Sequence, residues 1–149
     1  WEAPLEPFGI RLRRRAIQGW DDTGGTPPRA DPEGRTPGWL GINWLPEQRL
    51  LIGGVREGGP AHHAGLYAGD EIIAEDGFRV DKPRLWELLM QRGPKGKLAL
   101  TVFRRNELVQ IEIPLAEAPQ DWVWLEANKE AGKAQRGAFE AWSGAAFPD

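Results

Sequence analysis

The central part of the chain carries a regular pattern of apolar and polar positions. Runs that are apolar or alternate with polar residues predict β-strands, because strand side chains point alternately to opposite faces of a sheet. Five such runs occur at residues 39–45, 49–56, 71–75, 97–103 and 108–115. The last two flank a turn at residues 104–107 and predict a hairpin, so we expect this region to form a small sheet.

One stretch of this region repeats its apolar positions with the period of an α-helix. Asp81 is suited to cap a helix over residues 82–92. The positions expected to face the core are three leucines, Leu85, Leu88 and Leu89. Trp86 and Met90 widen the apolar arc on one side beyond what packing on one sheet requires, so we expect that side to face something else.

The two ends of the chain have weaker patterns. Apolar residues alternate with arginines over residues 10–17, as in a half-buried edge strand. The four arginines between residues 11 and 15 could form a patch for an anionic partner, but a solvated strand face needs fewer assumptions. Residues 19–38 are dense in Gly and Pro and predict a mobile loop. Near the other end we expect an extended piece at 121–125 and a helix at 129–142.

Residues 58–73 combine several backbone signals in a short space. Two glycines at 58 and 59 allow a tight turn, and Pro60 suits the first position of a helix, where its missing N–H needs no partner. Gly65 can take the left-handed conformation that ends a helix, and Leu66 can fold back onto it. The stretch therefore predicts a turn, a short helix, a second turn and a strand.

This succession resembles the G-S-P-A-x-x-A-G-L-x-x-G-D-x-I core of bacterial PDZ domains, with Gly59 where serine is usual. The resemblance implies an α+β, mainly β fold: a small, partly open β-barrel capped by helices at 59–66 and 82–92. We expect an N-terminal strand extension and a C-terminal helix around it. The expected divisions are an N-terminal extension at 1–37, a PDZ domain at 38–116 and a C-terminal extension at 117–149.

Composition narrows the classes of function. The 149 residues suffice for one domain with appendages, and we expect a single core. A net charge of −3 offers no concentrated basic face, so no nucleic-acid partner is expected. No apolar run approaches the roughly 18 residues of a membrane span, and the absence of cysteine excludes disulfides and thiolate zinc sites. The start at Trp1 suggests a fragment, which a signal peptide or a further domain could precede.

The loop before the first strand of the sheet is the candidate binding site. A PDZ domain binds the free C-terminus of a peptide as an added strand, and its carboxylate needs backbone N–H donors. Leu40, Gly41 and Ile42 fit an apolar-glycine-apolar loop that supplies them. The groove beside the peptide is expected to be lined by Asn43, Trp44, Trp86, Leu89 and Met90. The alternative is that these are core residues and that the groove is empty or filled by Trp86.

Catalytic and metal-binding motifs are not found. His62 and His63 are adjacent on a helix, so their side chains diverge by about 100° and do not share a metal as an i, i+4 pair could. Ser143 lacks a G-x-S-x-G context. The clustered carboxylates fall on alternating strand positions and turns, at Asp70, Glu71, Glu75 and Asp76. We therefore expect this segment to be non-catalytic and to hold no cofactor.

Four stretches resemble the glycyl aminopeptidase family of zinc metallopeptidases, whose H-E-x-x-H catalytic domain precedes a PDZ domain. They are Phe8-Gly9-Ile10-Arg11-Leu12, Gly38-Trp39-Leu40-Gly41, Phe103-Arg104-Arg105-Asn106-Glu107-Leu108 and Gln135-Arg136-Gly137-Ala138-Phe139-Glu140-Ala141-Trp142. Ser143 stands where leucine is common. The resemblance implies a zinc-bearing catalytic domain outside this chain and removal of N-terminal glycine or alanine from peptides.

The resemblance leaves three hypotheses open, because an aminopeptidase acts at an N-terminus whereas a PDZ groove takes a C-terminus. The module could tether substrate by binding peptide or protein C-termini. It could be a scaffold that packs on its own missing catalytic domain, with a disused groove. It could also belong to another bacterial envelope protease, such as an HtrA-like enzyme, although the C-terminal stretch disfavours this. The compartment, cytoplasm or periplasm, stays open.

Overall fold

The computed structural model describes residues 3–19, 22, 25 and 31–148, and the chain divides into two compact units. The first unit contains both ends of the chain, Trp1–Pro28 and Pro119–Asp149, and the second is Arg29–Ala118. The expectation of a single core is therefore wrong, because the first unit has a small hydrophobic cluster of its own. The second unit contains the whole of the segment expected to be the PDZ domain.

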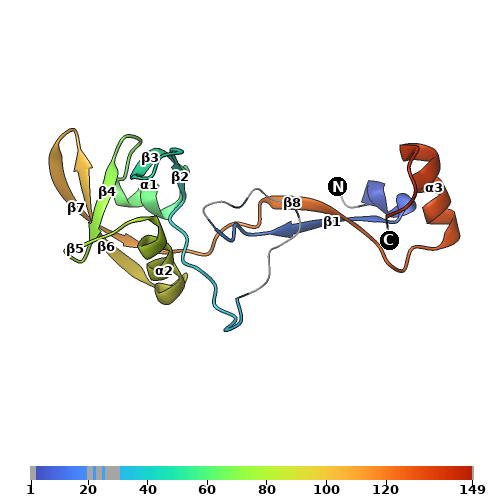
Figure 1. Ribbon diagram of the computed structural model, residues 1–149, viewed down its shortest axis with the longest axis horizontal. Coiled ribbons are helices and arrows are strands. Elements are labelled where there is room, and N and C mark those ends of the chain that lie inside the picture. Colours follow the sequence, from blue (N-terminus) through green and yellow to red (C-terminus); the bar gives the residue numbers. More distant parts are fainter. Residues whose placement is uncertain (1–2, 20–21, 23–24, 26–30, 149) are drawn as a thin grey trace. The chain divides into compact units, whose positions relative to one another are not determined.

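The second unit is built on an antiparallel sheet (Figure 1). Its strands are β2 (Ile42–Trp44), β3 (Leu50–Val55), β4 (Glu71–Glu75), β5 (Phe78–Arg79), β6 (Lys97–Arg104) and β7 (Glu107–Pro114). The strand order is β2-β3-β4-β6-β7, with β5 paired to β4. Two helices belong to this unit, α1 (Pro60–Ala64) and α2 (Lys82–Arg92). The mainly β, α+β class is confirmed, and the predicted elements lie within a few residues of the observed ones.

The sheet is open rather than closed into a barrel. Its strand path begins at β2 and ends at β7, and an isolated antiparallel bridge between Trp39 and Ala116 links the segments beside these strands. Since β2 has only three residues, it has few backbone groups with which to pair along β7 and close the sheet. The predicted barrel is thus corrected to an open sheet.

Alternating burial along the strands builds the core of this unit. The inward positions of β6, Leu98, Leu100 and Val102, are at most 1% exposed. The predicted leucine stripe of α2 is confirmed, since Leu85, Leu88 and Leu89 are all buried. Asp81 caps α2 as predicted: its carboxylate accepts a hydrogen bond from the Arg84 N–H at 2.9 Å.

The turn after α1 also follows the sequence signals. Gly65 ends the helix with φ of 82°, and the Leu66 N–H donates to the Ala61 carbonyl at 2.9 Å. The Leu66 side chain is fully buried, so its predicted return onto the helix is confirmed. Gly59 occupies the N-cap without a side-chain hydrogen bond.

A buried ion pair fixes the next corner. The Asp70 carboxylate, almost fully buried, accepts two hydrogen bonds from the Arg104 guanidinium, at 2.9 Å from Nε and 2.7 Å from Nη2. Arg104 also donates to the Gly65 carbonyl at 2.6 Å and lies over the Tyr67 ring. Burial alone would raise the pKa of Asp70, but the hydrogen bonds from Arg104 and the Tyr67 N–H outweigh it and lower the pKa. The pair ties the end of α1 to β6.

The first unit is a two-stranded antiparallel ribbon with helices at one end. Its elements are the 3-10 helix η1 (Ala3–Phe8), β1 (Ile10–Arg15), β8 (Trp122–Ala127) and α3 (Lys133–Ser143). The helix η1 was not predicted, and α3 begins later than expected because a turn precedes it, with the Ala131 N–H donating to the Asn128 carbonyl. Ile10, Ala131 and Phe147 form the buried cluster of this unit.

The arginine-rich strand is only partly a solvated face. Arg13 is exposed and pairs with Glu126 at 2.8 Å. Arg15 is only 6% exposed, and its guanidinium is bound by the Asp22 carboxylate, with 2.6 Å between Nη2 and Oδ1. The expectation of a solvated face is therefore wrong for Arg15, whose charge is matched by a nearby acid that follows it in sequence.

Part of the predicted mobile loop, at residues 20, 21, 23, 24 and 26–30, lies outside the described residues. The next described stretch, residues 31–35, is held by hydrogen bonds among its own residues. The Asp31 carboxylate accepts hydrogen bonds from the Arg35 guanidinium and from backbone N–H groups of Arg35 and Glu33, and these lower the pKa of Asp31 to about 2. In the described part of the chain, none of the helices has the length and apolar character to cross a membrane.

Candidate functional site

Three consecutive peptide units before and at the start of β2 have their carbonyl oxygens bound within the second unit. The Trp39 carbonyl accepts from the Ala116 N–H at 3.2 Å, and the Leu40 carbonyl accepts from the Ala61 N–H at 2.9 Å. The Gly41 carbonyl accepts from the Arg56 N–H at 2.8 Å. These partners come from three different parts of the fold: the segment after β7, helix α1 and the end of β3.

The bound carbonyls determine where the next amides point. The described chain has no cis peptide bond, and in a trans peptide the N–H points opposite to the C=O of the same unit. The N–H groups of Leu40, Gly41 and Ile42 are therefore turned away from Ala116, Ala61 and Arg56. None of the backbone hydrogen bonds outside helices and strands in the described residues uses the Leu40 or Gly41 N–H as donor.

Gly41 is required by the path of this loop. Its φ is +75°, a conformation that residues with a side chain rarely adopt. A Cβ atom at this position would also lie 3.3 Å from the Trp39 ring. The Trp39 ring is in turn approached by the Arg56 guanidinium, whose carbon is 5.8 Å from the ring centroid. The loop is thus held by backbone bonds and by the Trp39 ring.

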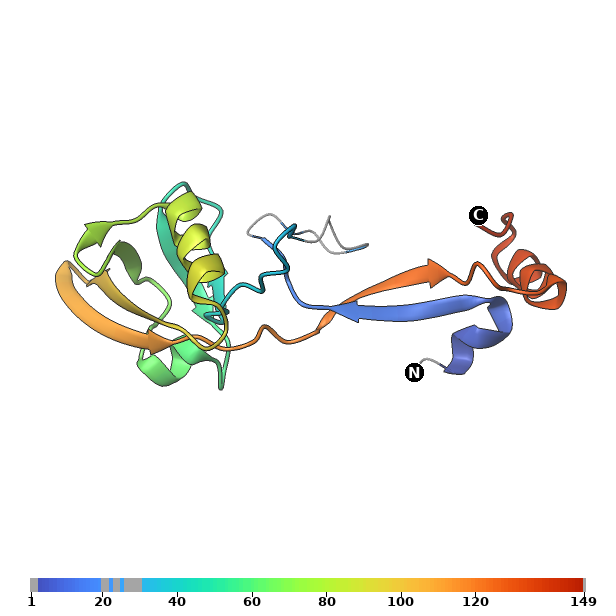
Figure 2. The ribbon, with the colours of Figure 1, turned by 90° about the horizontal axis from the view of Figure 1, so that it is seen from below.

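Helix α2 lies alongside β2 and runs antiparallel to it (Figure 2). At one end the Gly38 N–H donates to the Leu89 carbonyl at 2.8 Å, and at the other the Lys82 ammonium binds the Glu47 carbonyl. Because residues four apart lie on one helix face, Trp86 and Met90 share the side of α2 that Lys82 turns toward the β2–β3 turn. Both side chains are half-buried.

The predicted site residues take different positions around this strand and helix. Leu40 and Leu89 are each only 3% exposed and belong to the core beneath the loop. Ile42 and Trp44 are half-buried whereas Asn43 is exposed, as alternation along β2 requires. A register shift between Asn43 and Trp44 interrupts the β2–β3 pairing. Among the described strands β2 pairs only with β3, so none of these strands lies along its other edge.

Sequence reasoning missed the residues that hold the loop from behind. Arg56 and Ala61 act through their backbone N–H groups, and Trp39 acts through its ring. A backbone donor can be any residue but proline, so side-chain chemistry carries no signal for it. The proline at 60 is the available signal, since it begins the helix that presents the Ala61 N–H.

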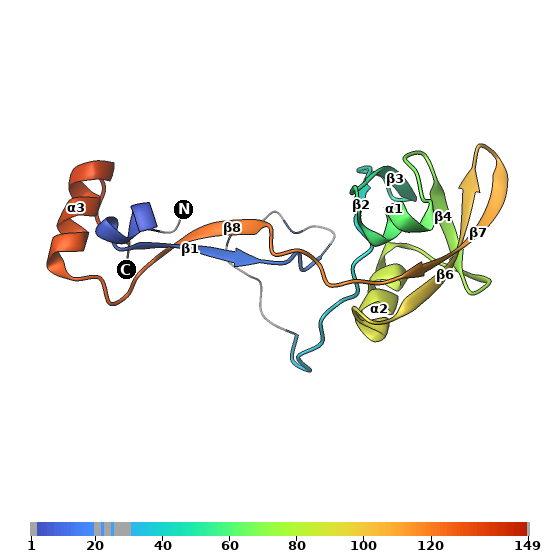
Figure 3. The ribbon, with the colours of Figure 1, turned by 180° about the vertical axis from the view of Figure 1, so that it is seen from behind.

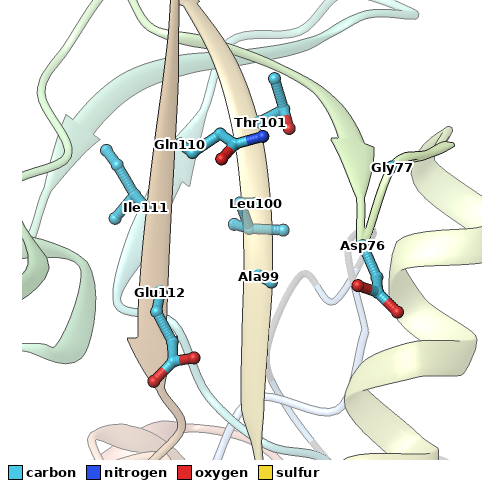
Figure 4. A pocket seen from close by; sticks show the side chains of 8 residues that line it. All are labelled: Asp76, Gly77, Ala99, Leu100, Thr101, Gln110, Ile111 and Glu112. Atoms are coloured by element: carbon cyan, nitrogen blue, oxygen red, sulfur yellow. The ribbon is translucent and has the colours of Figure 1, made fainter.

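A pocket lined by residues of the β4–β5 turn, β6 and β7 lies elsewhere in the second unit (Figure 4). Figure 4 shows Asp76 at the β4–β5 turn and Glu112 on β7, with β6 between them. The Glu112 carboxylate is bound by the Lys97 ammonium at 3.2 Å. The two acids therefore do not form a carboxylate pair.

The other polar residues that were considered make local contacts. The His62 Nδ1 accepts from the Gly58 N–H at 3.1 Å, and its ring centroid is 5.8 Å from that of His63. The Ser143 hydroxyl bonds the backbone of Ala145. The described residues contain no group of three or more His, Asp or Glu side chains that could hold a metal. The zinc of a metallopeptidase thus has no fitting ligand set in this part of the chain.

Comparison with known proteins links the chain to proteases. No protein-family model matches it. A protein of Brucella suis biovar 1, named as a DegP-like periplasmic serine endoprotease, is 33% identical over 98 aligned residues that cover 56% of this chain and 19% of that protein. A protein of Neisseria meningitidis serogroup A, named as a candidate zinc metalloprotease, is 33% identical over 87 residues, 58% of this chain and 19% of that protein.

A solved structure matches more of the chain. The crystal structure of an aminopeptidase N family protein from Idiomarina loihiensis superimposes with a TM-score of 0.72 and 25% identity, over 86% of this chain and 21% of that one. The chain spans about a fifth of the length of each of these proteins. The similarities are consistent with a PDZ-like region of a protease-family protein.

The matches cover different shares of this chain, 56% for the DegP-like protein and 86% for the aminopeptidase-family structure. The second unit, Arg29–Ala118, holds 90 of the 149 residues, about 60% of the chain. The DegP-like match is of that size, whereas the match to the aminopeptidase-family structure covers 86% and must extend into the first unit. The ribbon unit is therefore at least partly shared with the aminopeptidase-family protein.

Proposed function

We propose that the PDZ-like segment, residues 38–116, is a non-catalytic module that binds the free C-terminus of a peptide as an extra strand beside β2. The observation that carries the proposal is the set of three consecutive amides, Leu40, Gly41 and Ile42. The carbonyl of each of these peptide units is bound within the second unit, so the N–H groups point away from those partners. Neighbouring N–H groups of this kind suit a carboxylate, which accepts several hydrogen bonds at once.

The strand edge and the helix supply the rest of the proposed site. The edge of β2 beside which no described strand lies offers backbone groups to an antiparallel peptide strand, and Trp86 and Met90 form the opposite wall. Leu40 and Leu89 form the apolar floor on which the last side chain of the peptide packs. Asn43 contributes through its backbone, because its side chain is on the other face of the strand.

The parent protein is proposed to be a zinc aminopeptidase of the glycyl aminopeptidase kind, with its zinc in a catalytic domain outside these residues. The support is the structural match to an aminopeptidase-family protein, which extends beyond the second unit. Binding of a substrate C-terminus would then hold the far end of a short peptide while its N-terminus is cleaved. Peptide or protein C-termini and the parent's catalytic domain are the proposed partners.

A scaffold role with a disused groove is the second candidate. Trp86 is half-buried on the wall of the groove, and Lys82 already ties the start of α2 to the β2–β3 turn. A groove that is occupied by a tryptophan ring would hold α2 in place without taking a peptide. The similarity to DegP-like proteases keeps an HtrA-like parent as a further alternative, which the longer aminopeptidase match disfavours.

The test compares one peptide with a free, apolar C-terminus to the same peptide with an amidated end. The free acid should bind with a dissociation constant of roughly micromolar order or weaker, because one short strand buries a small interface. The amidated peptide should bind markedly less, since it has lost the charge. Equal affinity for the two, or no binding from a library of C-termini, would favour the scaffold role.

A further inference from the structure

Part of one face of the β1–β8 ribbon is mostly apolar and exposed. In the antiparallel register, Leu12 faces Leu125, and Arg14 faces Val123. Alternation places these four side chains on the same face of the ribbon. Leu125 is 60% exposed and Val123 is 48% exposed, although both are in regular strand.

The same face is covered at its other end by the helices of the first unit. Ile10 and Ala127, the next pair on this face, pack in the cluster with Phe147 and Ala131. Figure 3 shows η1 and α3 gathered at that end of the ribbon, while β1 and β8 continue beyond them. The apolar face is therefore one continuous surface that the unit's own helices cover only in part.

On the opposite face of the ribbon, two arginines pair with acidic residues of the same unit. Arg13 and Arg15 lie there with two half-buried tryptophans, Trp122 and Trp124. Arg13 pairs with Glu126, and Arg15 pairs with Asp22. Two of the three arginines on that face thus have an acidic partner within the unit, and the third, Arg11, is exposed to solvent. The face of Leu12, Val123 and Leu125 presents only apolar groups and Arg14 to a partner.

A bare two-stranded ribbon is weak by itself. Two strands without a covered hydrophobic face are marginally stable in water. Burial of apolar side chains stabilises a folded structure, so covering Leu125 and Val123 would stabilise the ribbon. The pattern of these side chains fits a strand pair that is completed by another surface.

We propose that this face docks on the part of the parent polypeptide that lies outside these 149 residues. The match to the aminopeptidase-family structure extends into the ribbon unit, and 79% of that protein lies outside the matched region, since the match covers 21% of it. The DegP-like match is no larger than the second unit. The ribbon is thus shared with the aminopeptidase-family protein and not with a match of the size of the second unit. The surface that it docks on should be apolar, with an acidic group facing Arg14.

This docking is independent of peptide binding, because its residues are in the first unit and the proposed groove is in the second. The test uses single cysteine substitutions followed by mass spectrometry of thiol labelling at that position. The 149-residue chain has no cysteine of its own. The probe is Leu125→Cys, and the matched control is Arg11→Cys, which is exposed on the opposite face of the ribbon.

In the intact parent protein, Leu125→Cys should label at least about tenfold more slowly than Arg11→Cys, as expected for a thiol that reacts only after local opening. In the 149-residue chain, the two should label at similar rates. Ala131→Cys, which is 8% exposed in the cluster, should stay slow in that chain and so report that the ribbon unit is folded.

Two outcomes would overturn the proposal. Rapid labelling of Leu125→Cys in the intact protein would mean that the face is bare there. Slow labelling already in the 149-residue chain would mean that the chain itself, or a second copy of it, covers the face. Either result leaves the comparison of free-acid and amidated peptides unaffected, so failure of docking and failure of peptide binding are separable.

Discussion

Gly41 combines two constraints that a side chain would violate. Its positive φ disfavours every residue with a Cβ, and a Cβ would crowd the Trp39 ring at 3.3 Å. A loop glycine at this position could be predicted from the sequence, because a lone glycine between apolar residues just before a strand favours a sharp change in backbone direction. The backbone donors behind it, at Ala61 and Arg56, could not be predicted, since any residue but proline can supply an N–H.

Gly41→Val should abolish peptide binding and leave the fold intact. A β-branched residue resists this φ and would push the loop away from Trp39, at a cost of about 1–2 kcal/mol for the backbone alone. Gly77→Val is the matched control, because Gly77 has φ of 81° and open space around it. Both variants should lose stability in urea unfolding, and Gly41→Val should lose more because of the contact with the Trp39 ring. Retained binding by Gly41→Val would contradict the proposed loop.

The Asp70–Arg104 pair is a second feature of single residues, and it sets a pH dependence. Because the folded-state pKa of Asp70 lies below its ordinary value of 3.8, the pair stabilises the fold fully above about pH 4. That stability is lost as the pH falls through the lower, folded-state pKa.

Asp70→Asn should lower the free energy of unfolding by about 3 kcal/mol near neutral pH, since it leaves a partly buried guanidinium without its counter-charge. The loss should shrink on going from neutral pH toward pH 2, because the stability that the ionised carboxylate contributes is lost as the pH falls through the folded-state pKa of Asp70. Urea unfolding at both pH values measures this, with Asp76→Asn at an exposed turn as the control. A loss that does not change with pH would argue against an ionised Asp70.

At the scale of elements, periodic patterns predicted the strands of the second unit, α2 and the leucine stripe. The errors occurred where local signals were overridden. The prolines at 4 and 7 argued against a helix in the sequence, yet η1 forms there and contains Pro7. Helix α3 begins later in the sequence than predicted, because a turn at Asn128–Ala131 precedes it. The sheet is open and not a partly open barrel, because β2 is only three residues long.

A substitution on helix α2 tests whether the groove is open to a peptide or filled by the Trp86 ring. If Trp86 forms a wall of the groove, Trp86→Ala should weaken binding of a free C-terminal peptide by about tenfold, as truncation of a buried aromatic contact does. If the Trp86 ring fills the groove, the same variant should bind better. Fluorescence anisotropy with a labelled peptide decides between them, and Trp142→Ala, which removes a 63% exposed ring on α3, should change nothing.

At the scale of the whole molecule, the sequence indicated two extensions around a PDZ domain, and the structure joins both ends of the chain into one unit. This pairing of β1 with β8 could not be predicted, because strands more than 100 residues apart in sequence carry no local signal of their register. The arginines of β1 illustrate the point, since Arg13 finds Glu126 only through that pairing.

The purified 149-residue chain should bind no stoichiometric zinc and should not cleave aminoacyl substrates. Its described residues hold no cluster of three metal-binding side chains, and His62 is already engaged with the Gly58 N–H. Elemental analysis after dialysis, with a peptidase assay on the same sample, measures both properties. One tightly held zinc per chain would contradict the assignment of catalysis to another domain.

The amides of Leu40, Gly41 and Ile42 are the centre of the proposed function, and NMR spectroscopy observes each of them separately. Titration with a free C-terminal peptide should shift these three backbone N–H resonances downfield, because each gains a hydrogen bond to a carboxylate. The amidated peptide should leave them nearly unchanged. Shifts of equal size with both peptides, or shifts confined to other parts of the chain, would contradict carboxylate binding at this loop.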